Sequence, residues 1–213
     1  MKIIADLHIH SKYSRAVSPL MTLENLDAWA DDKGINVIGT GDFTHPAWIK
    51  DIQKKLEPAE LGLFKLRKEF EKKTMKGTLA ETRFMLTVEI SSIYSRGGKT
   101  RRVHNLIFAP SVESALEINL ALGKIGNLKS DGRPIIGLDS EELLKIALEF
   151  GAVLVPAHIW TPWFAMFGSM SGFNTIEECF GDRAKYIHAI ETGMSSDPAM
   201  NWRLSKLDTI ALI

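Results

Sequence analysis

The sequence predicts a mixed α/β domain in which parallel strands alternate with helices. Apolar residues make up 45% of its 213 residues, which is enough to bury a sizeable core. Strand-like and helix-like segments alternate along the chain, and this order implies parallel pairing with right-handed crossovers. Because no linker and no internal repeat interrupts the alternation, we expect a single domain over 1–213.

Short apolar runs, several of them β-branched, predict the strands. They lie at 2–7, 35–40, 83–89, 103–108, 152–156, 186–191 and 209–213. Between two of them, the polar stretch 90–102 predicts a hairpin that turns at Gly97-Gly98-Lys99. Six or seven strand–helix units favour a barrel over an open sheet.

Apolar residues at helical spacing predict the helices. They lie at 22–33, 112–122, 140–150 and 198–206. Thr22 can cap the first helix, and Gly34 ends it. The charged stretch 47–73 is also helix-like, and Pro58 and Gly62 divide it into two pieces.

Composition excludes several classes of protein. The 26 basic and 26 acidic side chains balance, which excludes a histone-like polycation and leaves only a local basic patch for nucleic acid. The single cysteine, Cys179, excludes a disulfide framework and suits a reducing compartment. No apolar run approaches the roughly 18 residues that span a bilayer, so we expect a cytoplasmic protein without a membrane partner.

Histidines and acids gather where the predicted strands end. A period of two places His8 and His10 on one face, where they can share a cation. Further candidates close or open other strands: Asp42, Glu89, His104 and His158. Because the carboxyl ends of parallel barrel strands converge on one face, these side chains predict a metal site for zinc, manganese or iron.

Each candidate also has a structural interpretation. Glu89 would be a costly buried charge without a cation or a basic partner, which favours a metal-bridging role. Asp42 can instead cap the turn that precedes Pro46, and it competes with His45 for one role. Glu191 ends a strand, where lining the pocket and capping are equally compatible with the sequence.

The same residues carry a family resemblance. The chain resembles the PHP (polymerase and histidinol phosphatase) superfamily and, within it, the amino-terminal domain of the endonuclease Q family. The similar motifs are Asp6-Leu7-His8-Ile9-His10-Ser11, His10-Ser11-Lys12-Tyr13-Ser14, Gly39-Thr40-Gly41-Asp42-Phe43-Thr44-His45-Pro46, Val88-Glu89-Ile90-Ser91, Val103-His104-Asn105-Leu106, Pro156-Ala157-His158-Ile159-Trp160-Thr161-Pro162-Trp163 and Glu191-Thr192-Gly193. They extend over essentially the whole chain.

The resemblance implies a distorted (β/α)7 barrel with up to three divalent ions, which could be zinc, manganese or magnesium. His8, His10 and Glu89 would hold the first ion, and Glu89 would bridge it to a second ion on His104 and His158. Glu89, His104 and His158 are thereby the expected catalytic residues. Asp42 would help to hold the third ion, at a position where many relatives have a histidine.

The superfamily also has a final Asp-x-His motif after its last strand. This chain ends at Ile213, inside an apolar run and before any such motif. We therefore expect a C-terminally incomplete PHP domain with weakened or absent activity, without the zinc-binding module and helical region of endonuclease Q.

The implied activity is metal-dependent hydrolysis of DNA on the 5′ side of a deaminated base, such as uracil or hypoxanthine, or of an abasic site. The expected partners are damaged DNA and, more broadly, replication or repair proteins. Candidate substrate contacts, beyond the site itself, are His45, Glu191, the aromatic residues Tyr13, Trp160 and Trp163, and the basic residues Arg96, Lys99, Arg101 and Arg102. A phosphatase of the histidinol-phosphate type and a non-catalytic PHP scaffold are the alternatives.

Overall fold

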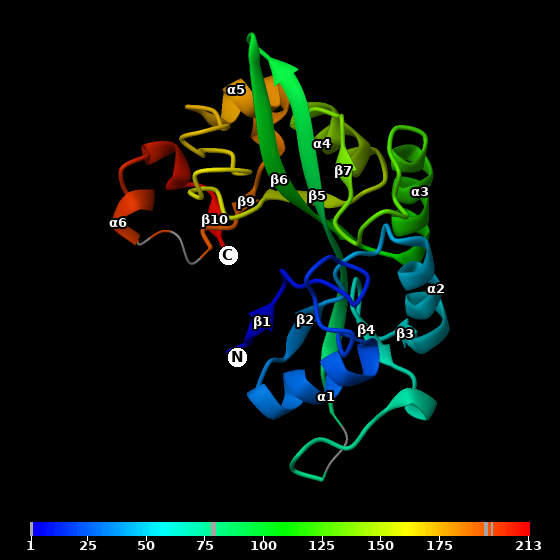
Figure 1. Ribbon diagram of the computed structural model, residues 1–213. Helices are drawn as coiled ribbons and strands as arrows, with labels where there is room; N and C mark the ends of the chain where they lie inside the picture. The colour runs from blue at the N-terminus through cyan, green and yellow to red at the C-terminus, as the bar shows by residue number, and fades with distance from the viewer. Residues whose placement is uncertain (1, 78–79, 194–195, 197) are drawn as a thin grey trace. The chain divides into compact units, whose positions relative to one another are not determined.

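The computed structural model describes residues 2–77, 80–193, 196 and 198–213 (Figure 1). The chain divides into two compact units. The first unit comprises Met1–Val88 with Phe108–Pro134, and the second comprises Glu89–Ile107 with Ile135–Ile213. Among the described residues, no helix is long and apolar enough to cross a membrane.

Parallel strands form the centre of the sheet in the first unit. β1 (Ala5–Asp6) pairs in parallel with β2 (Val37–Gly39), and β2 pairs in parallel with the start of β5 (Arg83–Arg96). On the other side of β5, the antiparallel hairpin of β3 (Leu56–Pro58) and β4 (Phe64–Leu66) extends the sheet. This half of the sheet is therefore mixed.

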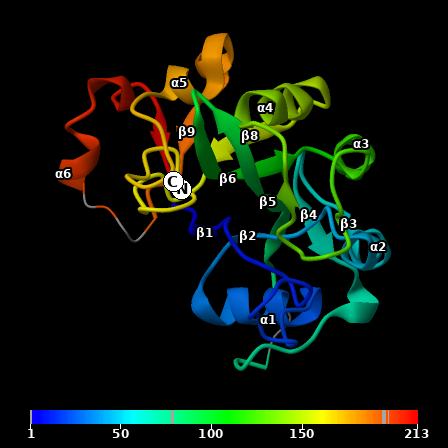
Figure 2. The ribbon, with the colours of Figure 1, turned by 45° about the horizontal axis from the view of Figure 1, so that its top comes forward.

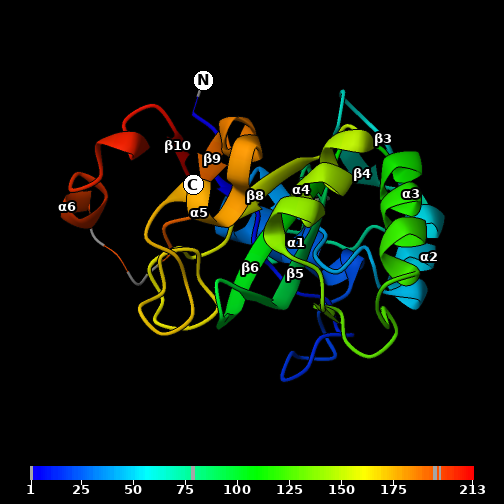
Figure 3. The same ribbon diagram turned by 90° about the horizontal axis from the view of Figure 1, so that it is seen from above.

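Three helices belong to the first unit: α1 (Leu23–Lys33), α2 (Pro46–Lys55) and α3 (Val112–Gly123). A short 3₁₀ turn, η1, covers Lys68–Phe70. Figures 1 and 3 show α2 and α3 side by side. The core includes Trp48 and Phe84, whose side chains are fully buried, so apolar packing holds these elements together.

The second unit contains the rest of β5, most of β6 (Lys99–Ala109), β7 (Ile135–Ile136) and β8 (Val153–Pro156). Its β6 lies between β5 and β8 (Figure 2), and β7 pairs in parallel with β5. A separate parallel pair joins β9 (Ala189–Ile190) to β10 (Ala211–Leu212).

The helical segments of the second unit are α4 (Ser140–Glu149), α5 (Ile176–Phe180), α6 (Pro198–Asn201), η2 (Gly181–Tyr186) and η3 (Ser205–Leu207). Asp139 caps α4 because its side chain accepts a hydrogen bond from the Glu142 N–H. The sequence did not predict β7, which is short and lacks a clear periodicity.

The mixed α/β class is confirmed, but some predicted elements are wrong. The second piece of the 47–73 helix is the β3–β4 hairpin, because Leu56, Phe64 and Leu66 are buried on alternate positions. Thr22 occupies the N-cap of α1, but its side chain makes no capping hydrogen bond. The helix predicted at 198–206 is interrupted after Asn201.

The predicted hairpin turn at Gly97-Gly98 is confirmed, but the strand predicted at 103–108 does not pair in parallel with the strand before it. It belongs to β6, which follows β5 after only Gly97 and Gly98, and a connection of two residues permits only antiparallel pairing. Both glycines have positive φ angles, 62° and 71°, as a tight hairpin turn requires. The pairings therefore support a mixed α/β sheet and do not establish a barrel of seven βα units.

Candidate metal centre

Three predicted ligands meet within the second unit. Glu89 lies on β5, His104 lies on β6, and His158 follows β8. The Oε1 atom of Glu89 is 2.6 Å from His104 Nδ1 and 3.1 Å from His158 Nε2. The two histidine nitrogens are 3.3 Å apart. One carboxylate and two imidazoles thus direct three potential ligand atoms at a common point.

The local fold explains why these residues meet. The hairpin brings Glu89 and His104 together on paired strands, and the Ala157 N–H donates to the His104 carbonyl oxygen, which holds the end of β8 against β6. His158 then follows directly in the chain. Its φ of 29° lies in the left-handed region, so the backbone turns sharply at the residue that presents the imidazole.

The donor set fits a divalent cation, because imidazole nitrogens and carboxylate oxygens are common ligands of such ions. The three atoms are spaced 2.6–3.3 Å apart, so Glu89 and His104 are in hydrogen-bond contact and would separate slightly to share an ion. Glu89 is only 2% exposed, and a buried carboxylate needs a cation or a proton donor as its partner.

Glu191 supports His158 from β9. Its side-chain Oε2 accepts the His158 N–H at 2.8 Å, and its backbone bonds to Pro156 and Ile159. Gly193 also approaches His158, because a Cβ built on this glycine would be 3.0 Å from the His158 Cβ. In the structure, the predicted pocket residue Glu191 thus holds the backbone that carries a candidate ligand.

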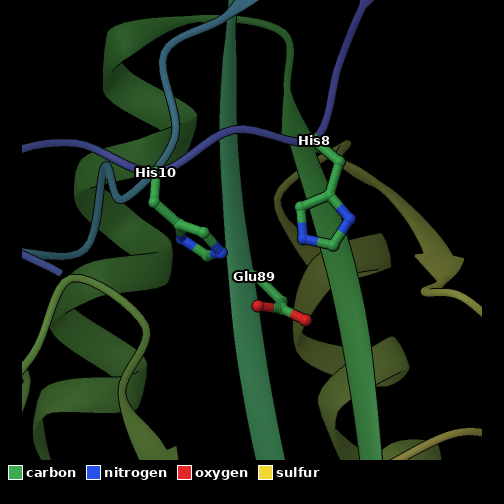
Figure 4. A group of neighbouring side chains, drawn as sticks. All are labelled: His8, His10 and Glu89. Atoms are coloured by element: carbon green, nitrogen blue, oxygen red, sulfur yellow. The ribbon is translucent and has the colours of Figure 1, made fainter. Parts of the chain in front are cut away.

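The first unit holds the other predicted histidines. Figure 4 shows His8 and His10 on the segment after β1, with both rings on the same side of that segment. Their ring centroids are 5.6 Å apart, in an edge-on arrangement. His10 Nδ1 is 3.1 Å from Oδ1 of Asp42, which is fully buried. A carboxylate at Nδ1 orients a ring so that Nε2 faces the other way.

The second oxygen of Asp42 is also fully engaged. Oδ2 accepts hydrogen bonds from the Ser11 N–H at 2.6 Å, from Ser11 Oγ at 2.7 Å and from Ser14 Oγ at 2.9 Å. Gly132 packs so closely that a Cβ there would be 2.2 Å from Oδ2. Asp42 is not among the described side chains that have the spacing of a metal site.

His45 has a helix-capping role. It is the N-cap of α2, and its Nδ1 accepts a hydrogen bond from the Ala47 N–H at 3.3 Å. Its ring stacks on Tyr13 with centroids 4.3 Å apart. Burial lowers the pKa of His45, which favours the neutral ring that accepts at Nδ1.

The predicted basic patch divides into engaged and exposed side chains. Arg96 donates to Glu141 at 2.6 Å and to the Cys179 carbonyl oxygen at 2.7 Å. Arg101 donates to the Gly172 carbonyl oxygen and lies over the Phe173 ring.

Lys99 and Arg102 differ from Arg96 and Arg101, whose guanidinium groups already have hydrogen-bond partners. Lys99 is exposed at the start of β6, and the Arg102 guanidinium lies 5.2 Å from the centre of the Trp163 ring, which is 45% exposed. Trp160, in contrast, donates through Nε1 to Asn201 Oδ1 at 2.7 Å, so its polar atom is already used. Lys99 and the Arg102–Trp163 pair are therefore the accessible part of the predicted substrate contacts.

Sequence reasoning did not identify three polar residues that contact candidate ligands. They are Ser11 and Ser14, which bind Asp42, and Thr161, whose hydroxyl is 3.2 Å from His158 Nδ1. The Asp42 cluster left a weak signal, because Ser11 and Ser14 closely follow His10. Thr161 belongs to the motif that follows His158, but it lies in an irregular loop and the motif assigns it no role.

The fold and the carboxylate–histidine cluster together define a mixed α/β protein with a candidate divalent-metal centre. No protein-family model matches the sequence. The structure is similar to a crystal structure described as the novel lesion-specific endonuclease PfuEndoQ from Pyrococcus furiosus. The two share 30% identity at a TM-score of 0.82, over 99% of this chain and 47% of that chain.

A second similar structure is endonuclease Q in complex with a 27-mer duplex substrate that has an abasic lesion at the active site. Here the TM-score is 0.81 and the identity 30%, over 98% of this chain and 47% of that one. The chain therefore spans about half the length of these endonuclease Q chains.

Two curated proteins, both named as uncharacterized, are similar in sequence. MJ0043 of Methanocaldococcus jannaschii is 33% identical over 158 residues, which are 74% of this chain and 16% of that protein. YqxK of Bacillus subtilis is 26% identical over an alignment 223 residues long, gaps included, which covers 97% of this chain and 52% of that protein. Neither name adds information on activity.

Proposed function

We propose that this chain carries the metal centre of a DNA endonuclease that cleaves at abasic sites or on the 5′ side of deaminated bases. The observation that supports this most strongly is the Glu89–His104–His158 cluster. It lies in a chain that is 30% identical in sequence to endonuclease Q and similar to it in fold. A complex of that enzyme contains a duplex with an abasic lesion, which favours damaged DNA as the substrate here.

The three side chains of the cluster would hold a divalent ion through Glu89 Oε1, His104 Nδ1 and His158 Nε2. A divalent ion bound there supplies Lewis acidity, which activates water near neutral pH and offsets charge that develops on phosphate oxygens. The Glu89 carboxylate would supply a negative charge to such an ion. Glu191 and the β6–β8 contact hold His158 and His104 so that little reorganisation is needed on binding.

The sequence resemblance extends this proposal to further ions. On that basis His8 and His10 act as ligands together with Glu89, and Asp42 contributes to a third ion. The hydrogen bonds that Asp42 makes with His10, Ser11 and Ser14 supply the orientation that such ligands need. Zinc, manganese and magnesium are all suitable divalent ions to test.

Accessible side chains on the β5–β6 hairpin and on the loop after β8 would bind the DNA. Lys99 can contact a phosphate, because such contacts are made chiefly by accessible basic side chains. The Trp163 ring, with Arg102 over it, offers an aromatic surface on which an unpaired base can stack. Phe164, the residue after Trp163, packs on the His104 ring at 4.7 Å, so this surface is connected to the candidate metal centre.

The direct test is cleavage of a labelled duplex with one abasic site or one uracil, with Mn²⁺, Mg²⁺ or Zn²⁺ added to metal-free protein. We expect a single cut next to the lesion that needs the metal. The Glu89→Gln variant should lose at least 100-fold in rate and in metal affinity. Glu149→Gln, which alters an exposed carboxylate in the same unit, is the matched control and should behave like the wild type.

Three results would contradict the proposal. Equal cleavage by the wild type and Glu89→Gln would place the activity outside this cluster. Tight metal binding with hydrolysis of a small phosphate monoester, but not of damaged DNA, would favour the phosphatase alternative. Absence of metal binding by the wild-type protein would favour the non-catalytic scaffold.

A further inference from the structure

The Thr161 hydroxyl contacts His158 on the side of the ring away from Glu89. Its Oγ1 is 3.2 Å from His158 Nδ1, 2.8 Å from the Trp163 carbonyl oxygen and 3.3 Å from the His158 carbonyl oxygen. A hydroxyl has a single hydrogen to donate and two lone pairs with which to accept. Carbonyl oxygens only accept, so the hydroxyl hydrogen is directed to a carbonyl, with Trp163 at the shorter distance.

The hydroxyl therefore faces Nδ1 as an acceptor. We propose that Thr161 is a positioning residue that holds the neutral His158 ring in the tautomer with its hydrogen on Nδ1. The Nε2 atom then presents a bare lone pair towards Glu89 Oε1 at 3.1 Å and His104 Nδ1 at 3.3 Å. Which ring nitrogen can bind a metal is set by the hydrogen bond that the other nitrogen makes.

This tautomer makes the cluster receptive to a cation. With the hydrogen on Nδ1, the lone pair of His158 Nε2 and an oxygen of Glu89 face each other as two acceptors, and a positive charge between them removes their repulsion. The other tautomer would satisfy the same contact with an Nε2–H···O hydrogen bond and would oppose metal binding. In this respect the inference rests on the proposed metal centre.

The backbone around Thr161 keeps the hydroxyl in place. The Thr161 N–H donates to the His158 carbonyl oxygen at 3.1 Å, which closes a turn around Ile159 and Trp160. Beyond the turn, the His104 N–H donates to the Phe164 carbonyl oxygen at 2.9 Å. The loop that carries Thr161 is thus tied to both imidazole-bearing segments of the cluster.

The test uses the metal-free wild-type protein, labelled with ¹⁵N in its histidine rings, at an alkaline pH at which the rings have lost the imidazolium proton. Long-range ¹H–¹⁵N spectra distinguish the two neutral tautomers, and a His158→Asn variant assigns the signals. We expect the wild-type His158 ring to carry its hydrogen on Nδ1. In Thr161→Val, which keeps the shape of the side chain, the ring should shift towards the Nε2–H form.

Two further variants separate the role of the hydroxyl from a general structural effect. Thr161→Ser retains the hydroxyl and should keep the wild-type tautomer. Thr100→Val removes an exposed hydroxyl from the β5–β6 hairpin and should leave the His158 signals unchanged. Zn²⁺ affinity, measured by competition with a chelating dye, should fall about 10–100-fold in Thr161→Val and recover in Thr161→Ser.

The outcomes distinguish this inference from the proposed function. A wild-type ring protonated on Nε2, or a Thr161→Val ring that stays protonated on Nδ1, would overturn the role of Thr161. A tautomer that shifts as expected in a protein that binds no Zn²⁺ would support the role of the hydroxyl and overturn the proposed metal centre.

Discussion

Asp27, in the middle of α1, provides a quantitative prediction of how stability depends on pH. Its side chain is 2% exposed, and within the described part of the chain no donor reaches its Oδ2 atom. Burial raises the pKa of this carboxyl from 3.8 to about 7, and the nearby charges of Glu71 and Asp31 act in the same direction. Arg83 opposes the shift, but more weakly.

The sign of the effect follows from proton binding. Between the two pKa values the folded protein retains a proton that the unfolded chain releases, so the free energy of unfolding falls as pH rises. The stabilisation is fully present below pH 3.8 and is lost as pH rises through about 7. The total is about 4 kcal/mol, of which about 2.5 kcal/mol is lost between pH 5 and pH 8.

Urea unfolding of the wild type and of Asp27→Asn at pH 5, 6, 7 and 8 measures this loss. The amide does not titrate. Between pH 5 and pH 8 the free energy of unfolding of the wild type should therefore fall by about 2.5 kcal/mol more than that of the variant. Asp208→Asn, at an exposed position, is the control and should follow the wild type. Parallel pH profiles for the wild type and Asp27→Asn would refute the reasoning.

Three other predictions concern packing, an ion pair and DNA binding. Gly132→Ala places a Cβ 2.2 Å from Asp42 Oδ2 and should cost about 1–3 kcal/mol in urea unfolding; a loss under about 0.5 kcal/mol would show that the site relaxes freely. Arg96→Gln loses its bond to Glu141 and should destabilise by about 2–3 kcal/mol. The exposed Lys99→Gln should leave stability within about 0.5 kcal/mol and lower the salt slope of DNA binding by about 1, and an unchanged slope would exclude Lys99 from the interface.

Sequence reasoning found the cluster because its residues interrupt apolar strands. Glu89 stands between Val88 and Ile90, and a charge in such a run needs a partner that the strand itself does not supply. His104 and His158 were found in the same way. The relation between polar residues and strand ends is local, so it can be read without knowing the final fold.

The contacts that orient the ligands could not be found in that way. Thr161 reaches His158 through an irregular turn, and no periodicity marks such a residue. The β3–β4 hairpin was missed for a related reason. Its residues have helical spacing and charge, but pairing of Phe64 with Phe84 on β5 selects the extended form, and a tertiary contact of this kind overrides local preference.

The left-handed backbone at two functional positions also has a consequence for protein engineering. Asp42 and His158 have φ angles of 51° and 29°, where a side chain costs about 1–2 kcal/mol relative to glycine. At Asp42 the hydrogen bonds with His10, Ser11 and Ser14 offset this strain, so stability and the orientation of His10 favour the same residue. At His158, selection for thermal stability alone could favour glycine and remove a candidate ligand, so libraries built to improve expression of this protein should hold His158 constant.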